Sequence, residues 1–295
     1  MGLIKELREV KKYMPQITSA FERFDHGEDP KKALEEIINI AEDYPALDEF
    51  LKFNETRGLI LRGQERAEKE AKKRGWNYGW NYACKEALKE IGVNYEIRGG
   101  KNIPKDGGVL YVSNHPYGLL DSIILLGGLG SLVSKEKRKL KVIGMNQLRF
   151  IKGLEEVVYF VHSTVKGPNF SIRRSLRYLD KGGDLAIYPS GRMSKLGLRE
   201  YPWKENLETF ISHSKYVVPM WFSGPDHSKI YNFLAFFKEK LRRAFSLGEV
   251  WDKEGETVIL NIGDPIKSED LELIENPEEM VQHLRDITEC LKVAV

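Results

Sequence analysis

VLYVSNHPYGLLDS, residues 109–122, joins an apolar run to a histidine, a proline and a glycine, and then to a second apolar run that carries an aspartate. Val109 to Ser113 is rich in the β-branched and aromatic residues that favour strands. Pro116 and Gly118 suit a turn and a helix start, so a helix is expected from about Leu119. A strand, a tight turn and a helix in this order are typical of one unit of an α/β sheet.

The downstream sequence repeats this alternation. Further strand candidates, short and nearly continuous in apolar residues, are Lys141 to Gly144, Val157 to Val161, Asp184 to Tyr188, Val217 to Phe222 and Thr257 to Ile262. Helices are expected at Leu120 to Gly127, Ser171 to Asp180, Lys204 to Ser212 and Phe233 to Phe245. Continuous apolar strands require cover on both faces. The sequence therefore predicts an α/β fold with a mixed, largely parallel central sheet flanked by helices.

Residues 1–92 show the spacing of helices. The clearest is WNYGWNYACKEALKEIG, which ends at Gly92 and forms one apolar stripe from Trp76, Trp80, Ala83, Ala87, Leu88 and Ile91. Such a stripe is typical of a helix packed in a core. We expect a small all-helical domain over residues 1–92, followed by an α/β domain over residues 93–295.

Composition narrows the class of protein. With 41% hydrophobic and 31% charged residues, the chain of 295 residues is of the globular type. Its 46 basic and 44 acidic residues are too balanced for nucleic acid to be the main partner. The two cysteines, Cys84 and Cys290, supply neither a disulfide framework nor a zinc motif and indicate a reducing, cytoplasmic compartment.

We expect the chain to lie on a membrane without crossing it, peripherally at the inner face. The N-terminal residues lack a signal-peptide core, and the most apolar stretch, residues 119–133, is shorter than the ~20 residues that a spanning helix needs. Residues 232–245 combine phenylalanines with basic residues as an interfacial helix does, although burial against the sheet explains the phenylalanines equally well. SKEKRKLK, residues 134–141, suits an acidic acyl carrier protein, a phosphorylated coenzyme or headgroups, or is a solvated face.

His115 and Asp121 are a candidate catalytic pair. On a straight helix a separation of six positions places two side chains about 120° apart, but the turn at Pro116 and Gly118 allows His115 to fold back over the helix. Asp121, in the first helical turn, would then accept the imidazole N–H and stabilise the imidazolium. Since no G-x-S-x-G elbow is present, the proton would come from a substrate hydroxyl. The alternative is that Asp121 caps the helix and His115 bonds a loop carbonyl.

YPSGRMSK, residues 188–195, is a second polar segment at the end of a predicted strand. Ligands gather at the carboxyl ends of strands in open α/β sheets, so this segment and His115 are expected to share one site. Gly191 permits close approach of a ligand to the backbone, and the nearby groups suited to an anion are Arg192, Ser194 and Lys195. A plain strand-exit turn with solvated basic residues is the alternative.

Taken together, NHPYGLLDS, YPSGRMSK, VVPMWFSG and VILNIGDPI resemble the motifs of the glycerophospholipid (lysophospholipid) acyltransferase superfamily, over roughly residues 90 to 270. The likeness is greatest to its hemolysin-like, lyso-ornithine-lipid acyltransferase branch, which also has five rather than four residues between the histidine and the aspartate. The resemblance implies that His115 is the general base and Asp121 its orienting carboxylate. An acceptor hydroxyl would attack an acyl thioester directly, with acyl-CoA or acyl carrier protein as the donor and without a cofactor or metal.

This sequence departs from the family pattern in two motifs. The acceptor-holding Pro-Glu-Gly-Thr-Arg segment has Ser190 in place of its glutamate and its arginine displaced to Arg192. The arginine that closes the second motif is absent; Ser163 or Thr164 stands there, so a phosphate contact would come from Lys166, Arg173 or Arg174. The substrate-binding residues implied are Asn114, Pro189, Ser190, Gly191, Arg192, Ser194, Lys195, Arg173 and Arg174. Val218 and Pro219 match the fourth motif, near the path of the acyl chain.

The expected function is transfer of a fatty acyl group to the hydroxyl of a lysolipid or of a glycerol-phosphate-like acceptor. The alternative is a non-catalytic lipid-binding or scaffold protein with the same fold. A metal-dependent hydrolase is a weaker alternative, because His162, His213 and His227 lie in different segments without the i, i+4 spacing of a metal-binding helix.

Overall fold

The computed structural model describes residues 52–161, 170–194, 199–228, 231 and 248–293, together with residues 15, 16, 19, 39 and 48. Four sets of expectations therefore lie outside the described residues. They are the helices upstream of residue 52, the interfacial helix at residues 232–245, Lys195, and the residues named within 162–169, which are His162, Ser163, Thr164 and Lys166.

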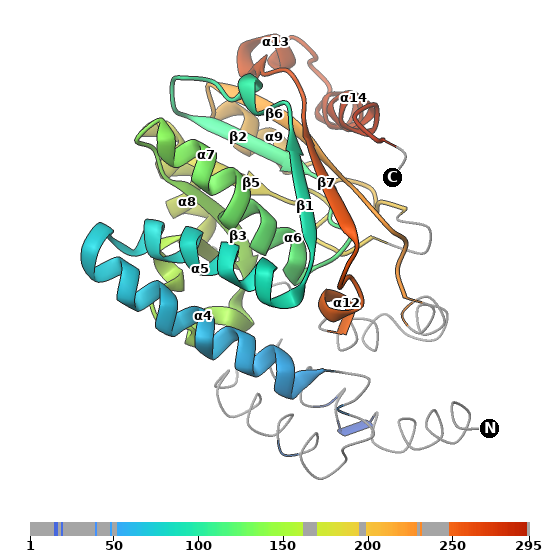
Figure 1. The fold of residues 1–295 in the computed structure, drawn as a ribbon. Helices are drawn as coiled ribbons and strands as arrows, with labels where there is room; N and C mark the ends of the chain where they lie inside the picture. Colours follow the sequence, from blue (N-terminus) through green and yellow to red (C-terminus); the bar gives the residue numbers. More distant parts are fainter. Residues whose placement is uncertain are drawn as a thin grey trace, which may run out of the picture.

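One mixed sheet of eight strands forms the centre of the molecule, in the order β1-β7-β6-β2-β5-β3-β4, with β8 paired to β6 (Figure 1). The pairings are parallel except those of β6 with β7 and with β8. The strands are β1 (Asn94–Arg98), β2 (Val109–Ser113), β3 (Leu140–Met145), β4 (Val158–Val161), β5 (Asp184–Ile187), β6 (Tyr216–Ser223), β7 (Thr257–Ile262) and β8 (Ile266–Lys267). The six predicted strands are present, and the predicted fold class is confirmed.

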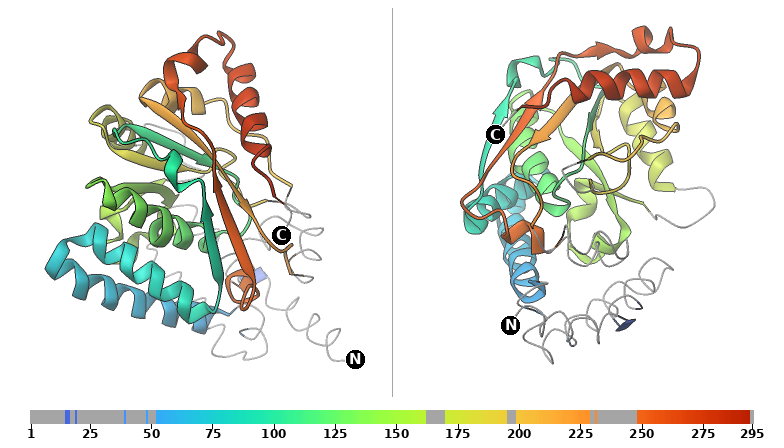
Figure 2. Two further views of the ribbon diagram at one scale, coloured as in Figure 1. Left: turned by 45° about the horizontal axis from the view of Figure 1, so that its top comes forward. Right: turned by 90° about the vertical axis from the view of Figure 1, so that its right-hand side faces the viewer.

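Helices cover both faces of the sheet. Helices α5, α6 and α7 lie on one face with α4 outside them, and α8, α9, α13 and α14 lie on the other (Figures 1 and 2). The helices are α4 (Phe53–Arg74), α5 (Trp76–Ile91), α6 (Leu119–Ile124), α7 (Gly130–Lys135), α8 (Phe170–Asp180), α9 (Leu207–Ser212), α12 (Gly248–Trp251), α13 (Ser268–Glu272) and α14 (Pro277–Glu289). Shorter helical turns are η1 (Gly100–Asn102), η2 (Leu125–Leu129), η3 (Asn146–Phe150) and η4 (Leu154–Glu156).

Alternation along the central strand β2 divides the core in two. Val109 and Tyr111 belong to the cluster under α5, α6 and α7, while Leu110 and Val112 belong to the cluster under α8, α9 and α14. Successive side chains of a strand point to opposite faces, and all five residues of β2 are buried. The end of β2 is therefore held rigidly from both sides.

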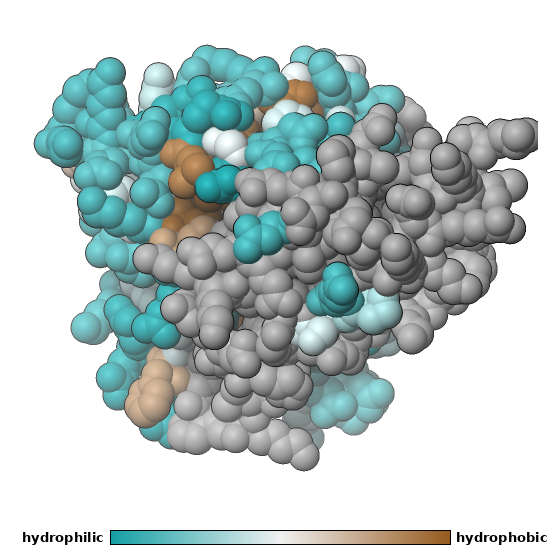
Figure 3. Space-filling model, turned by 90° about the horizontal axis from the view of Figure 1, so that it is seen from below, coloured by the Kyte–Doolittle hydropathy of each residue, from teal (hydrophilic) through white to brown (hydrophobic). Residues whose placement is uncertain are grey.

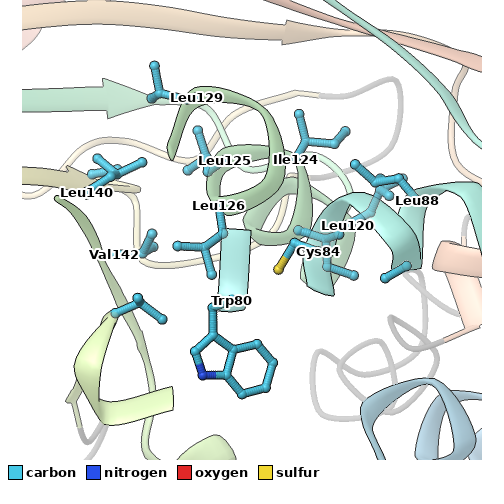
Figure 4. Close-up of a cluster of buried hydrophobic side chains, with 14 of the residues drawn as sticks. Trp80, Cys84, Leu88, Leu120, Ile124, Leu125, Leu126, Leu129, Leu140 and Val142 are labelled. Carbon is cyan, nitrogen blue, oxygen red and sulfur yellow. The ribbon is translucent and has the colours of Figure 1, made fainter. Parts of the chain in front are cut away.

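Helix α5 is part of the first of these clusters. Figure 4 shows Trp80, Cys84 and Leu88 of α5 against the leucines of α6 and η2. The predicted stripe is thus a core stripe. Helix α4 crosses α5 closely, since a Cβ at Gly79 would lie 2.3 Å from the carbonyl oxygen of Ala67. The division of the chain after residue 92 stays a prediction.

Among the described residues no helix combines the length and the apolar character needed to cross a membrane. The face seen in Figure 3 is mostly hydrophilic in its described part, with hydrophobic residues in a few small separate areas.

A buried ion pair fixes the start of β2 and of β5. Nη1 of Arg138 lies 2.7 Å from Oδ2 of Asp184, and these side chains are 13% and 0% exposed. Asp184 also accepts the backbone N–H of Val109 at 3.3 Å, and Arg138 donates to the carbonyl oxygens of Pro104 and Asp106. Burial raises the pKa of Asp184 to about 7, and the charge of Arg138 opposes this rise. The ionised form of the Asp184 carboxylate is therefore stabilised by the guanidinium of Arg138.

We expect Arg138→Ala to lower the free energy of unfolding by about 3–5 kcal/mol, because it leaves a carboxylate buried without its partner. Urea unfolding at neutral pH measures this. The exposed neighbour Lys139 provides the control, and Lys139→Ala should change stability by less than about 0.5 kcal/mol. Equal stabilities of the two variants would contradict the structural role of the pair.

Candidate active site

The loop after β2 brings His115 back onto the helix that follows it. Helix α6 begins at Leu119, as expected, after Gly118 with φ of 63°, a backbone conformation that favours glycine. Nδ1 of His115 lies 2.8 Å from Oδ2 of Asp121. The same oxygen accepts the backbone N–H of Tyr117 at 2.9 Å. The side chain of Asp121 is fully buried, whereas that of His115 is 19% exposed.

Burial and neighbouring groups set the charges of this pair. Burial raises the pKa of Asp121, while the hydrogen bond and charge of His115 and the N–H of Tyr117 oppose the rise. Oδ1 of Asp121 is buried and has no hydrogen-bond partner among the described residues. A carboxylate in such a low-dielectric site interacts strongly with a positive charge that forms beside it.

The imidazole of His115 is also fixed by stacking. Its ring lies 3.9 Å from that of Tyr188, centroid to centroid, at 14° between the planes. Tyr188 follows β5, and its hydroxyl lies 3.5 Å from Oγ of Ser122 on α6. Burial raises the pKa of Tyr188 well above its ordinary value, so the hydroxyl stays neutral. The stack and the Asp121 bond together leave Nε2 of His115 as the ring atom able to exchange a proton.

Asn114 ties the start of the loop to the neighbouring strand β6. Its Nδ2 donates to the carbonyl oxygen of Phe222 at 2.9 Å, and its Oδ1 accepts the N–H of Phe222 at 2.7 Å. The side chain is fully buried. Both of its polar groups are therefore engaged with backbone, directly before His115.

The segment after β5 forms a tight turn. The N–H of Gly191 donates to the carbonyl oxygen of Tyr188 at 2.8 Å, and Gly191 has φ of 62°. Ser190 is buried, donates to the carbonyl oxygen of Arg192 at 2.9 Å and accepts the N–H of that residue at 3.4 Å. Beyond the turn, the N–H of Ser194 donates to the carbonyl oxygen of His115 at 2.7 Å. The two polar segments thus meet at one edge of the sheet.

A carboxylate that the sequence analysis did not single out joins these two segments. Oε2 of Glu200 accepts the backbone N–H of His115 at 3.2 Å and the hydroxyl of Ser194 at 2.8 Å. Burial raises the pKa of Glu200, and the nearby hydroxyls of Ser190 and Ser194 oppose the rise. Glu200 belongs to no spacing motif, so its only signal was its place a few residues after YPSGRMSK.

Basic groups border the turn. The guanidinium carbon of Arg192 lies 5.3 Å from the ring centroid of Tyr201, and the Arg192 residue is exposed. Nζ of Lys204 lies 2.7 Å from where a Cβ of Gly191 would be. Pro189, the residue before the turn, is buried and accepts the N–H of Lys204 at 3.3 Å. The turn therefore carries two basic side chains.

The remaining predicted site residues lie elsewhere on the sheet. Arg173 and Arg174 are exposed near the start of α8, which packs on β4 and β5. Strand β4 is an edge strand, separated from β2 by β5 and β3. Val218 is fully buried in the core. In the pairing of β6 with β2, Val218 is in register with Tyr111 and Pro219 with Val112. The predicted contacts of these four residues with substrate stay predictions.

The described residues contain no group of three or more His, Cys, Asp or Glu side chains that could hold a metal ion. His227 is buried, and its Nδ1 lies 3.2 Å from Oε2 of Glu249, whose carboxylate is also 3.6 Å from Nζ of Lys253. His213 lies on the surface, with its Nδ1 2.7 Å from Oδ1 of Asp180. Each histidine has one carboxylate partner in these contacts, from a different part of the chain.

Comparison with known proteins adds two curated relatives. No family model matches the chain. A lyso-glycine lipid O-acyltransferase of Bacteroides thetaiotaomicron is 24% identical over 213 residues, which cover 68% of this chain and 76% of the relative. A protein of the same name from Phocaeicola vulgatus is 23% identical over 211 residues, 68% of this chain and 74% of the relative. The crystal structure of the 1-acyl-sn-glycerophosphate (LPA) acyltransferase PlsC from Thermotoga maritima superimposes with a TM-score of 0.49 and 15% identity, over 99% of this chain and 96% of that one.

Proposed function

We propose that this chain, an acyltransferase of the lysophospholipid acyltransferase superfamily, transfers a fatty acyl group from an acyl thioester to a hydroxyl of a lyso-lipid. The observation that carries this proposal is the bond of 2.8 Å between Nδ1 of His115 and Oδ2 of Asp121 at the carboxyl end of β2. A histidine oriented by a buried carboxylate is suited to act as a general base.

His115 and Asp121 divide the proton transfer between them. Because the carboxylate of Asp121 can only accept, Nδ1 of His115 carries the hydrogen and Nε2 is free to take the proton of the acceptor hydroxyl. The hydroxyl oxygen attacks the thioester carbonyl carbon, the C–S bond breaks in the resulting tetrahedral intermediate, and the leaving thiolate receives the proton from Nε2. Asp121 stabilises the imidazolium between these two steps. The reaction yields an ester and a free thiol without an acyl-enzyme.

We propose that the acceptor is a lyso-lipid with an amino-acid headgroup. Both curated relatives are named lyso-glycine lipid O-acyltransferase. Ser190 replaces the glutamate that the superfamily uses in its acceptor motif, and Arg192 and Lys204 border the same turn. A guanidinium pairs well with a carboxylate or a phosphate, so the basic turn supports an anionic headgroup.

The donor and the place of action follow from the same proposal. A lipid acceptor has to be collected from a bilayer, which supports peripheral association with the inner face of the membrane and a cytoplasmic location. The donor is a thioester of coenzyme A or of acyl carrier protein, and no cofactor is required. Lys135, Lys137 and Lys139 are exposed in the basic run at residues 134–141, a surface that suits either an acidic carrier or anionic headgroups.

The proposal is tested with purified protein, a long-chain acyl-CoA or acyl carrier protein thioester, and a panel of acceptors. The panel contains lyso-glycine lipid, lysophosphatidic acid and glycerol 3-phosphate, and products are quantified by mass spectrometry. We expect the O-acylated glycine lipid to form fastest. Binding of lipid without any acylated product would identify a non-catalytic lipid-binding protein instead.

We expect Arg192→Ala to raise KM for the lyso-lipid about tenfold, because the variant loses one charge-assisted hydrogen bond near the surface. KM for the thioester should change less than about twofold. Initial rates with each substrate varied in turn measure this split. Arg177→Ala, on the exposed side of α8, is the control and should leave both constants unchanged. Equal increases in both KM values would count against headgroup binding by Arg192.

A further inference from the structure

Glu200 is a second carboxylate beside the histidine, after Asp121. Its Oε2 accepts the backbone N–H of His115 at 3.2 Å and the Ser194 hydroxyl at 2.8 Å, and the N–H of Ser194 returns to the carbonyl oxygen of His115 at 2.7 Å. These three hydrogen bonds form a closed ring of contacts. The ring holds the peptide units on both sides of the His115 Cα in place.

The second oxygen of this carboxylate is also buried. Oε1 of Glu200 has no hydrogen-bond partner among the described residues, and burial raises the pKa of the group. Among the groups that act on the charge of Glu200 is His115 in its protonated form. A positive charge on the imidazole would therefore relieve the cost of burying this carboxylate.

We propose that Glu200 is a positioning residue that holds the backbone of His115 and, through its charge, favours the protonated imidazole during acyl transfer. This role rests on the proposed function of His115 as the general base. Asp121 orients Nδ1 from one side, and Glu200 fixes the main chain from the other. Proton uptake by His115 then places the new charge near two carboxylates, so the imidazolium forms more readily than it would with Asp121 alone.

In the described part of the chain, three titratable groups on different elements contact His115 or interact with its charge. They are Asp121 on α6, Tyr188 after β5, and Glu200 itself. His227, which follows β6, acts on Asp121. Of these groups, Glu200 can be neutralised without changing the Nδ1 bond or the ring stack.

The test is Glu200→Gln, which keeps an amide oxygen to accept the N–H of His115 and the hydroxyl of Ser194 but removes the charge. A negative charge stabilises a nearby imidazolium, so its loss should move the acid limb of the kcat/KM profile to lower pH. On the plateau, kcat should fall about three- to tenfold because the base is weaker. KM for both substrates should stay within about twofold of the wild-type values, since the bonds of the loop are kept.

Two further variants complete the design. Glu200→Asp keeps the charge and should retain the wild-type acid limb even where the shorter side chain lowers kcat. Glu205→Gln removes an exposed charge from the same segment and should leave the profile unchanged. A Glu200→Gln variant that loses activity with its acid limb unmoved would overturn the role of the charge.

The histidine pKa is also measured directly, by NMR titration of the ring signals without substrate, with His115→Ala identifying the resonance. We expect a lower pKa for His115 in Glu200→Gln than in the wild type and in Glu205→Gln. This readout does not require activity. An absence of acyl transfer in the wild type would therefore contradict the proposed function, whereas an unchanged His115 pKa would overturn the inference on Glu200.

Discussion

Replacement of His115 by alanine is expected to reduce acyl transfer about 10³-fold, the usual contribution of a general base, and to leave the fold intact. The side chain lies on a loop, is 19% exposed and, in the described part of the chain, forms its hydrogen bond with Asp121 through Nδ1. Its removal leaves the acceptor hydroxyl without a group to take its proton. Steady-state rates of acylated-lipid formation, with unfolding curves of both proteins, measure the two parts of this prediction.

The chain offers a matched control on its surface. Nδ1 of His213 lies 2.7 Å from Oδ1 of Asp180, the same type of pair, but these side chains are 37% and 48% exposed. His213→Ala should retain full activity. A His115→Ala protein that keeps more than about a tenth of the wild-type rate would remove His115 from the role of base.

Replacement of Asp121 by asparagine is expected to reduce kcat about 10²-fold or more without loss of stability. Asparagine cannot stabilise the imidazolium and can bond the other tautomer of His115. The pKa of Asp121 is raised by burial, so its ionised form costs stability above the folded-state pKa, and this cost is absent below the pKa of the unfolded chain. At pH 7 the variant should therefore unfold with an equal or higher free energy.

This prediction separates catalysis from helix capping. Oδ2 of Asp121 also accepts the N–H of Tyr117, which is the contact that a purely structural carboxylate would make. A structural role predicts that Asp121→Asn loses stability and keeps its rate per folded molecule. A catalytic role predicts the reverse, and unfolding in urea at pH 7 together with kcat decides between them.

Much of the sheet could be predicted because its strands are buried on both faces. Strand β2 has the predicted bounds, and all of its residues are buried. Strand β1 was missed because its residues alternate between exposed and half-buried at the edge of the sheet. Its partner β7 is also distant in the chain, since Asn94 pairs in register with Thr257. Helix α14 was missed although Asn276 and Pro277 are a helix-start signal, and the Asn276 side chain does accept the N–H groups of the first turn.

In the candidate site, too, local contacts could be predicted from the sequence and distant contacts could not. The approach of His115 to Asp121 depends on local turn chemistry at Gly118, which the sequence displays. The bond of Glu200 to the His115 backbone joins positions 85 residues apart, and no local pattern reports such a contact. Similarly, Asn114 was expected to bind substrate, whereas its side-chain bonds in the structure go to the backbone of Phe222 on β6.

The most direct test of the account is the order in which thiol and acylated lipid appear. The protein is first mixed with an acyl thioester alone, its intact mass and the free thiol are measured, and lyso-glycine lipid is then added. Direct attack by the acceptor hydroxyl predicts an unchanged protein mass, no thiol before the acceptor is added, and afterwards one acylated lipid for each thiol. One equivalent of thiol released without acceptor, with a protein heavier by one acyl group, would contradict it.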